Sequence, residues 1–159
     1  MRKFIVADPE KCTGCGVCEL VCSASKDKHF NPRMSRIRVV RIEPMVNIAI
    51  ACRLCEDPAC VRCCPRNALR QAEETGVIVV DETKCDGCGW CINACKFGAI
   101  IVHPYKKVAV VCDLCEGGEP LCVKFCLEQA LEVTTLDAVS EKARRSVIKE
   151  LFIEESSSS

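Results

Sequence analysis

The chain has 159 residues with 22 basic and 22 acidic side chains, so its formal net charge is zero. This length suits one compact domain or two small ones, and the balanced charge gives no sign of a nucleic-acid partner. Residues 1–8 lack the apolar stretch of a secretory signal, and no apolar run approaches the roughly 20 residues of a membrane span. We therefore expect a cytoplasmic protein without a membrane span.

Large core side chains are scarce, whereas cysteine is abundant. The chain has one Trp, one Tyr and five Phe against 17 cysteines. An odd count, the expected reducing compartment and ligand-like spacings argue against a disulfide scaffold. We therefore expect the stability of the fold to depend on what the cysteines bind.

Four cysteine motifs of two alternating types follow one another along the chain. The segment 6–22 is repeated as 79–95, and the segment 52–56 as 112–116, which indicates a duplicated two-motif unit. In chain order the motifs are Cys12, Cys15, Cys18 and Cys22; Cys52, Cys55, Cys60 and Cys64; Cys85, Cys88, Cys91 and Cys95; and Cys112, Cys115, Cys122 and Cys126.

Short apolar runs between the motifs predict strands. They lie at residues 46–51, 77–80, 99–102 and 108–111, and residues 37–42 alternate apolar side chains with arginine. After each of the last three motifs, Ala and then Leu or Ile follow the fourth cysteine at the same spacing, which suits a helical turn leading into a strand.

The C-terminal residues differ from the rest of the chain. Apolar side chains recur at helical spacing over residues 136–153 and predict an amphipathic helix. Packing against the core is the favoured interpretation of this helix, and docking to a partner is the alternative. Residues 154–159 end in four serines and predict a disordered tail.

The cysteine spacings indicate iron–sulfur clusters. A 4Fe–4S cube needs four thiolates, and a loop with three closely spaced cysteines can supply three of them. Gly14, Gly16, Gly87 and Gly89 let the backbone approach the cluster with little strain. The fourth cysteine lies three residues further on, where a helix can begin. Zinc is the main competing metal, but its sites are typically built from two well-separated pairs of cysteines.

The seventeenth cysteine makes one ligand assignment ambiguous, because Cys63 and Cys64 are adjacent. The spacing shared with the other motifs and the following Pro65 favour Cys64 as the ligand, and Cys63 is then a buried spare thiol. His29 and His103 belong to no ligand constellation, and surface or turn roles are expected of them. The cations beside the motifs are interpreted as ordinary solvated charges: Arg53, Arg62, Arg66, Lys96 and Lys124.

With these motifs, residues from about 6 to 131 resemble the four-cluster, ferredoxin-like iron–sulfur subunits of molybdenum and tungsten oxidoreductases, such as those of dimethyl sulfoxide reductase and formate dehydrogenase. The resemblance implies an α+β fold, namely a duplicated bacterial two-cluster ferredoxin with short antiparallel strands and short helices around four 4Fe–4S clusters. An inserted module of residues 51–110 would interrupt an outer module of residues 1–50 and 111–135. The sequence departs from the family pattern in two respects. The fourth motif has a short gap between its second and third cysteines, and proline follows the last cysteine of one motif rather than of all four. These departures leave the identity of the partner open.

The resemblance also implies a ligand pairing that spacing alone does not establish. Each motif would give three cysteines to one cluster and its last cysteine to another. The four sets would be Cys12, Cys15, Cys18 and Cys126; Cys112, Cys115, Cys122 and Cys22; Cys52, Cys55, Cys60 and Cys95; and Cys85, Cys88, Cys91 and Cys64.

The function expected from the motifs and the resemblance is electron transfer without a catalytic site of its own, because sixteen ligands leave no open iron corner. The implied partner is a large tungsten- or molybdenum-pterin subunit of an anaerobic enzyme, such as a tungsten aldehyde oxidoreductase. A flavin subunit or a ferredoxin would complete the path, and self-stacking is conceivable but not required. The alternatives are a subunit of a hydrogenase or carbon monoxide dehydrogenase, a free-standing polyferredoxin, an enzyme in its own right, and clusters that serve only as structural staples.

Overall fold

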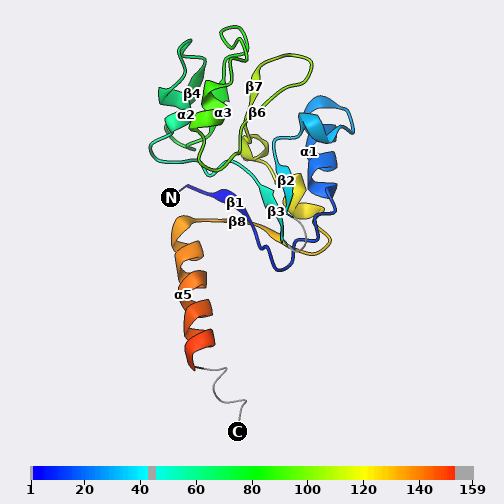
Figure 1. The fold of residues 1–159 in the computed structure, drawn as a ribbon, viewed down its shortest axis with the longest axis vertical. Coiled ribbons are helices and arrows are strands. Elements are labelled where there is room, and N and C mark those ends of the chain that lie inside the picture. The colour runs from blue at the N-terminus through cyan, green and yellow to red at the C-terminus, as the bar shows by residue number, and fades with distance from the viewer. Residues whose placement is uncertain (1, 43–45, 153–159) are drawn as a thin grey trace.

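The structure of the protein is a computed structural model that describes residues 2–42 and 46–152 (Figure 1). Its strands are short and pair two by two in four antiparallel sheets, and its first four helices are short as well. This arrangement confirms the predicted α+β class with short antiparallel strands and short helices.

The strand pairs bring together segments that are close in sequence, with one exception. The exception is β1 (Phe4–Ala7), which pairs with β8 (Leu131–Thr134) and so joins the two ends of the cysteine-rich region. The other pairs are β2 (Arg38–Ile42) with β3 (Val46–Ile50), β4 (Leu69–Gln71) with β5 (Ile78–Val80), and β6 (Ile101–Val102) with β7 (Ala109–Val110). The apolar runs predicted as strands therefore form strands, with trimmed ends.

The helices within the motifs begin one residue before the third cysteine, and the expected start at the fourth cysteine is wrong. They are α1 (Val17–Asp27), α2 (Ala59–Arg62), α3 (Trp90–Ala94) and α4 (Leu121–Lys124). Helices α1 and α3 are preceded by Gly16 and Gly89, whose backbones have a left-handed conformation. Helices α2 and α4 are preceded by Pro58 and Pro120. These residues end the loop and direct the chain into the helix, so the third cysteine already lies in the first turn. Two short 3-10 helices complete the elements, η1 (Pro32–Met34) and η2 (Leu114–Gly117).

The elements gather in two groups at opposite ends of the cysteine-rich body (Figure 1). Helix α1 packs against α4 beside the β1–β8 pair, and helix α2 packs against α3 near the β4–β5 pair. The first and fourth motifs thus share one group, and the second and third motifs share the other. The proposed boundaries between an outer and an inserted module fall between these groups and stay a prediction.

The buried core consists mainly of aliphatic side chains and cysteines. Phe4 is the one aromatic residue in it among the described residues. Six cysteines are buried with these aliphatic residues: Cys18, Cys52, Cys60, Cys91, Cys112 and Cys122. Thiols therefore make up a large part of the core alongside the aliphatic side chains.

Helix α5 (Leu136–Phe152) forms as predicted but does not pack as predicted (Figure 1). None of its residues is buried, and Leu136, Val147, Ile148, Leu151 and Phe152 are between 52% and 73% exposed. The packing interpretation is wrong because only Val139, near the start of the helix, contacts the core. The remainder of α5 projects away from the body. Residue 153 and the predicted tail of residues 154–159 lie outside the described residues.

Candidate iron–sulfur cluster sites

Three small cavities of similar size are each lined by four thiols. The empty space between the lining residues, including space open to solvent, is about 330, 350 and 350 Å³. We name each cavity after one of its cysteines. The Cys64 cavity is lined by Cys64, Cys85, Cys88 and Cys91; the Cys22 cavity by Cys22, Cys112, Cys115 and Cys122; and the Cys12 cavity by Cys12, Cys15, Cys18 and Cys126.

The remaining four motif cysteines also lie near one another. Burial raises the pKa of Cys60 to about 11, and the neighbouring thiols of Cys95 and Cys55 add to this rise. Burial likewise raises the pKa of Cys52 to about 12, with smaller contributions from Cys60 and Cys55. We call Cys52, Cys55, Cys60 and Cys95 the Cys52 set.

The four thiol sets follow one another in a series. Burial raises the pKa of Cys91 in the Cys64 cavity, and the nearby thiol of Cys60 in the Cys52 set adds to this rise. Burial also raises the pKa of Cys52, with a contribution from the thiol of Cys112 in the Cys22 cavity. Burial likewise raises the pKa of Cys122 in that cavity, with a smaller contribution from the thiol of Cys18 in the Cys12 cavity. Cys15 and Cys88, one in each end cavity, are the exposed thiols among the seventeen, none of which forms a disulfide. The series therefore reaches the surface at both ends.

Main-chain N–H groups point at the thiols of the cavities. Ala68 donates to Cys64 Sγ and Ala130 to Cys126 Sγ, each over 3.3 Å, and both alanines belong to the repeated pattern after the motifs. The N–H groups of Arg36 and Ala109 likewise donate to Cys22 and Cys85. Donors of this kind stabilise a thiolate and tune a cluster that it holds.

The adjacent thiols Cys63 and Cys64 lie in different surroundings. Burial would raise the pKa of Cys64, but the N–H groups of Ala68 and its neighbours outweigh burial and lower it. The pKa of Cys63 is raised by burial, and the thiol of Cys64 adds to the rise. Cys63 is half-buried, with its Sγ 3.4 Å from the carbonyl oxygen of Cys60, so it is less buried than expected.

The donor set of each cavity fits a cube better than a single ion. The described residues contain no group of three or more His, Cys, Asp or Glu side chains close enough together to hold one metal ion. A 4Fe–4S cube takes one thiolate at each of four separate iron atoms, so its ligands stand around a cavity. Four cysteines line each of the three cavities, which satisfies this requirement.

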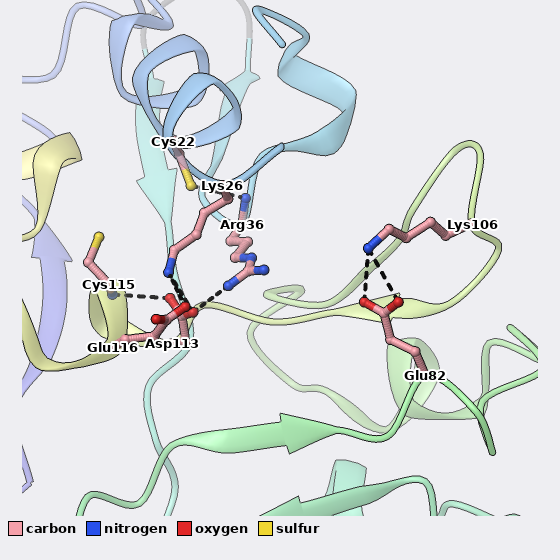
Figure 2. Close-up of polar contacts among 8 residues, drawn as sticks. All are labelled: Cys22, Lys26, Arg36, Glu82, Lys106, Asp113, Cys115 and Glu116. Atoms are coloured by element: carbon pink, nitrogen blue, oxygen red, sulfur yellow. Dashed lines mark hydrogen bonds and ion pairs between the residues drawn. The ribbon is translucent and has the colours of Figure 1, made fainter. Parts of the chain in front are cut away.

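Three charged residues that line the Cys22 cavity, Lys26, Arg36 and Asp113, were not identified from the sequence (Figure 2). Lys26 and Arg36 both bind Asp113 Oδ2, and Lys26 also binds Glu116 Oε1 over 2.9 Å. Burial alone would raise the pKa of Asp113, but Lys26 and Arg36 outweigh it and lower that pKa. Their positions in the sequence could have indicated that they lie near a cluster site, because Lys26 lies one helical turn after Cys22 and Asp113 directly follows Cys112.

Most of the cations beside the motifs are solvated charges, as expected, whereas Arg53 and His103 differ in part from expectation. Three cations form exposed ion pairs, Arg62 with Asp57, Arg66 with Asp86 and Lys124 with Glu119. The Arg53 guanidinium instead lies over the rings of Phe4 and Phe97. His103 has a turn role, since its Nδ1 accepts from the N–H groups of Tyr105 and Lys106, but it is buried rather than on the surface.

Comparison with known proteins identifies the family. The 4Fe–4S dicluster domain matches residues 44–136, and the 4Fe–4S binding domain matches residues 5–23, so the two matches include all four motifs. The polyferredoxin-like subunit of an aliphatic sulfonate oxidoreductase from Pyrococcus furiosus is 42% identical over 137 residues, which are 84% of this chain and 79% of the relative. The protein belongs to the ferredoxin-like 4Fe–4S electron-transfer subunits.

Further relatives of this ferredoxin-like subunit are parts of oxidoreductases. A subunit of the anaerobic dimethyl sulfoxide reductase of Escherichia coli is 34% identical over 155 residues, covering 85% of this chain and 74% of the relative. Among solved structures, the active site complex BamBC of benzoyl coenzyme A reductase contains a polypeptide with a TM-score of 0.50 and 28% identity. That match covers 96% of this chain and 93% of the other.

The protein thus binds 4Fe–4S clusters and transfers electrons, and several of its relatives are named as subunits of oxidoreductases. Within residues 2–42 and 46–152, none of its helices is long and apolar enough to cross a membrane.

Proposed function

We propose that the protein holds four 4Fe–4S clusters in a row and relays single electrons between a catalytic molybdenum or tungsten subunit and a second carrier. The observation that carries this proposal is the series of four thiol sets, which begins and ends at the exposed cysteines Cys88 and Cys15. Such a series would allow electrons to enter at one end of the molecule and leave at the other.

The ligands in this proposal are the sixteen motif cysteines in the four sets described above. Their grouping supports the expected exchange of the fourth cysteine between motifs, since Cys126 lines a cavity with the first motif and Cys22 lines one with the fourth. Cys64 likewise lines a cavity with the third motif, and Cys95 lies near the second. A module of residues 51–110 inserted in an outer module of residues 1–50 and 111–135 would explain this exchange.

The chain contributes binding, shielding and electrostatics to the relay. When bound, each cluster supplies a centre that accepts and returns one electron. The buried cysteines and the aliphatic residues around them exclude water from the interior of the series. Main-chain donors such as those of Ala68 and Ala130 stabilise the negative charge on the thiolates.

The end cavities offer surfaces on which partners could dock. Trp90, between Cys88 and Cys91 in sequence, is 60% exposed, and Leu127, directly after Cys126, is 82% exposed. Exposed large apolar side chains of this kind are typical anchors of protein interfaces. We propose that a pterin-containing catalytic subunit binds at one of these ends and that a flavin subunit, a ferredoxin or a second copy of the protein binds at the other.

The oxidoreductases named for the relatives support a catalytic partner of this kind, and an enzyme related to the tungsten aldehyde oxidoreductases is our specific proposal. Anaerobic affinity purification from the native host tests it. We expect recovery of a complex with a large subunit that contains tungsten or molybdenum and a pterin. Recovery of the protein alone, or only with a hydrogenase or carbon monoxide dehydrogenase, would overturn the proposed partner.

The same purification can identify the docking end. Trp90→Ala and Leu127→Ala each remove the exposed apolar side chain at one end, whereas Phe30→Ala removes one that is 80% exposed and lines none of the three thiol cavities. We expect one of the two end variants to lose the catalytic subunit at least tenfold more readily than Phe30→Ala. Equal retention in all three variants would contradict docking at the ends.

A further inference from the structure

An ion-pair group forms part of the wall of the Cys22 cavity (Figure 2). Lys26 Nζ lies 2.8 Å from Asp113 Oδ2, and Arg36 Nη1 donates to the same oxygen. The three residues come from helix α1, from the segment before β2, and from the residue before η2. They therefore connect three separate parts of the chain at one candidate cluster site.

Each of the three residues is also tied to a ligand of that site. Lys26 lies on the same helix as Cys22, and the main-chain N–H of Arg36 donates to Cys22 Sγ over 3.4 Å. Asp113 Oδ1 accepts the N–H of Cys115 over 3.0 Å. The charges are thus held at fixed positions relative to the thiols.

Low exposure makes these charges effective. The side chains of Lys26, Asp113 and Arg36 are 12%, 17% and 26% exposed. By contrast, the Arg66–Asp86 pair at the Cys64 cavity is 62% and 43% exposed. Water screens an exposed charge strongly and a buried one weakly, so charges at the Cys22 cavity act more strongly on their site than those at the Cys64 cavity.

The ion-pair group has two cations, Lys26 and Arg36, but one largely buried carboxylate, Asp113. Glu116, the other carboxylate that Lys26 binds, is 79% exposed and is therefore well screened. Arg36 Nε is buried and has no hydrogen-bond partner within residues 2–42 and 46–152. The donor belongs to a guanidinium whose residue lines the cavity.

We propose that Lys26 and Asp113 set the reduction potential of the cluster bound in the Cys22 cavity, with Lys26 favouring its reduced form and Asp113 its oxidised form. This inference rests on the proposed function, because it requires a cluster in that cavity. One electron arrives from a neighbouring cluster or partner, and the site gains one negative charge. No bond forms or breaks and no proton is needed, so nearby fixed charges act directly on the energy of the step.

Two variants that remove opposite charges test the proposal. Lys26→Gln removes a cation, and Asp113→Asn removes an anion but keeps an oxygen that can accept the N–H of Cys115. Lys28→Gln is the matched control, because Lys28 directly follows the last residue of the same helix but is exposed. The reduction potential of each cluster is measured by anaerobic redox titration followed by electron paramagnetic resonance at one pH, and Cys115→Ser identifies the signal of this cluster.

We expect one signal to move to lower potential in Lys26→Gln and the same signal to move to higher potential in Asp113→Asn, with no shift in Lys28→Gln. Shifts in the same direction, no shift with full iron content, or loss of this cluster from both variants would overturn the inference and indicate a purely structural ion-pair group. If Cys115→Ser neither removes nor alters any cluster signal, the proposed cluster at this site is contradicted, and this result is distinct from failure of the inference about Lys26 and Asp113.

Discussion

At the scale of single residues, the adjacent thiols Cys63 and Cys64 differ in their surroundings although they share a backbone. Main-chain donors lower the pKa of Cys64, whereas burial raises the pKa of Cys63. We therefore expect Cys64→Ser to lose or convert one cluster and Cys63→Ser to leave the spectrum of the reduced protein nearly unchanged. Electron paramagnetic resonance of the two variants, purified without oxygen, measures this difference, and the reverse result would show that Cys63 is the ligand.

A glycine in the third motif is required by a close approach of the backbone. Gly87 has φ +70°, and a Cβ there would lie 2.1 Å from the carbonyl oxygen of Lys107. Gly98 also has a left-handed φ of +63°, but nothing lies within 4 Å of the position of its Cβ. Left-handed strain alone costs about 1–2 kcal/mol in a non-glycine residue.

Gly87→Ala and Gly98→Ala therefore separate the clash from the strain. We expect Gly98→Ala to retain its full iron content and to lower the free energy of unfolding by about 1–2 kcal/mol. Gly87→Ala should lose iron from the Cys64 cavity, because the loop that carries Cys85 and Cys88 must move away from Lys107. Iron content and thermal unfolding measure both effects, and equal behaviour of the two variants would rule out the close approach as the reason for Gly87.

At the scale of elements, the sequence was informative where ligands dictate local geometry. The repeated cysteine spacing identified the thiols that gather in sets, and the short β-branched runs predicted strands β3, β5, β6 and β7. The start of each motif helix was mistaken because it depends on the residue that ends the loop, such as Gly16 or Pro58, rather than on a ligand. Strand β1 was not predicted, because its partner β8 lies at the far end of the cysteine-rich region. Pairing between such distant segments produces no pattern in the sequence near either strand.

The same limit applies to the candidate sites. Lys26 and Asp113 meet only because α1 and η2 approach one another in the fold, and their separation in sequence hides that contact. For helix α5, the spacing of the apolar residues predicted the helix correctly. The same spacing could not show whether the apolar side chains pack against the core or face away from it.

Helix α5 contributes little to the stability of the body. Its main polar links to the body are the contacts of Lys142 with Asp8 at 3.5 Å and with Glu132 at 3.4 Å, and Lys142 is 62% exposed. Exposed pairs of this kind are worth about 0–1 kcal/mol each. A chain that ends after Ser140 should therefore keep its clusters and unfold at nearly the same temperature as the full chain. Calorimetry measures this, and a marked fall in unfolding temperature together with loss of iron would show that α5 supports the fold.

At the scale of the whole molecule, the clusters would take the place of a conventional core. Among the described residues, one aromatic side chain, Phe4, and a set of aliphatic residues pack with six buried cysteines. Burial raises the pKa of several of these thiols, to about 12 for Cys18 and about 11 for Cys112, so their thiolates are unfavourable unless iron neutralises them. Fold, ligand arrangement and electron transfer are then consequences of the same four thiol sets.

The number of iron and sulfide ions per chain tests the central claim most directly. Sixteen cysteine ligands at four per cube predict about 16 iron and about 16 sulfide per chain in protein that is made and purified without oxygen. Chemical iron and sulfide assays, with zinc measured on the same sample, give the result. Iron and sulfide near half these values, with zinc as the balance, would contradict a relay of four clusters.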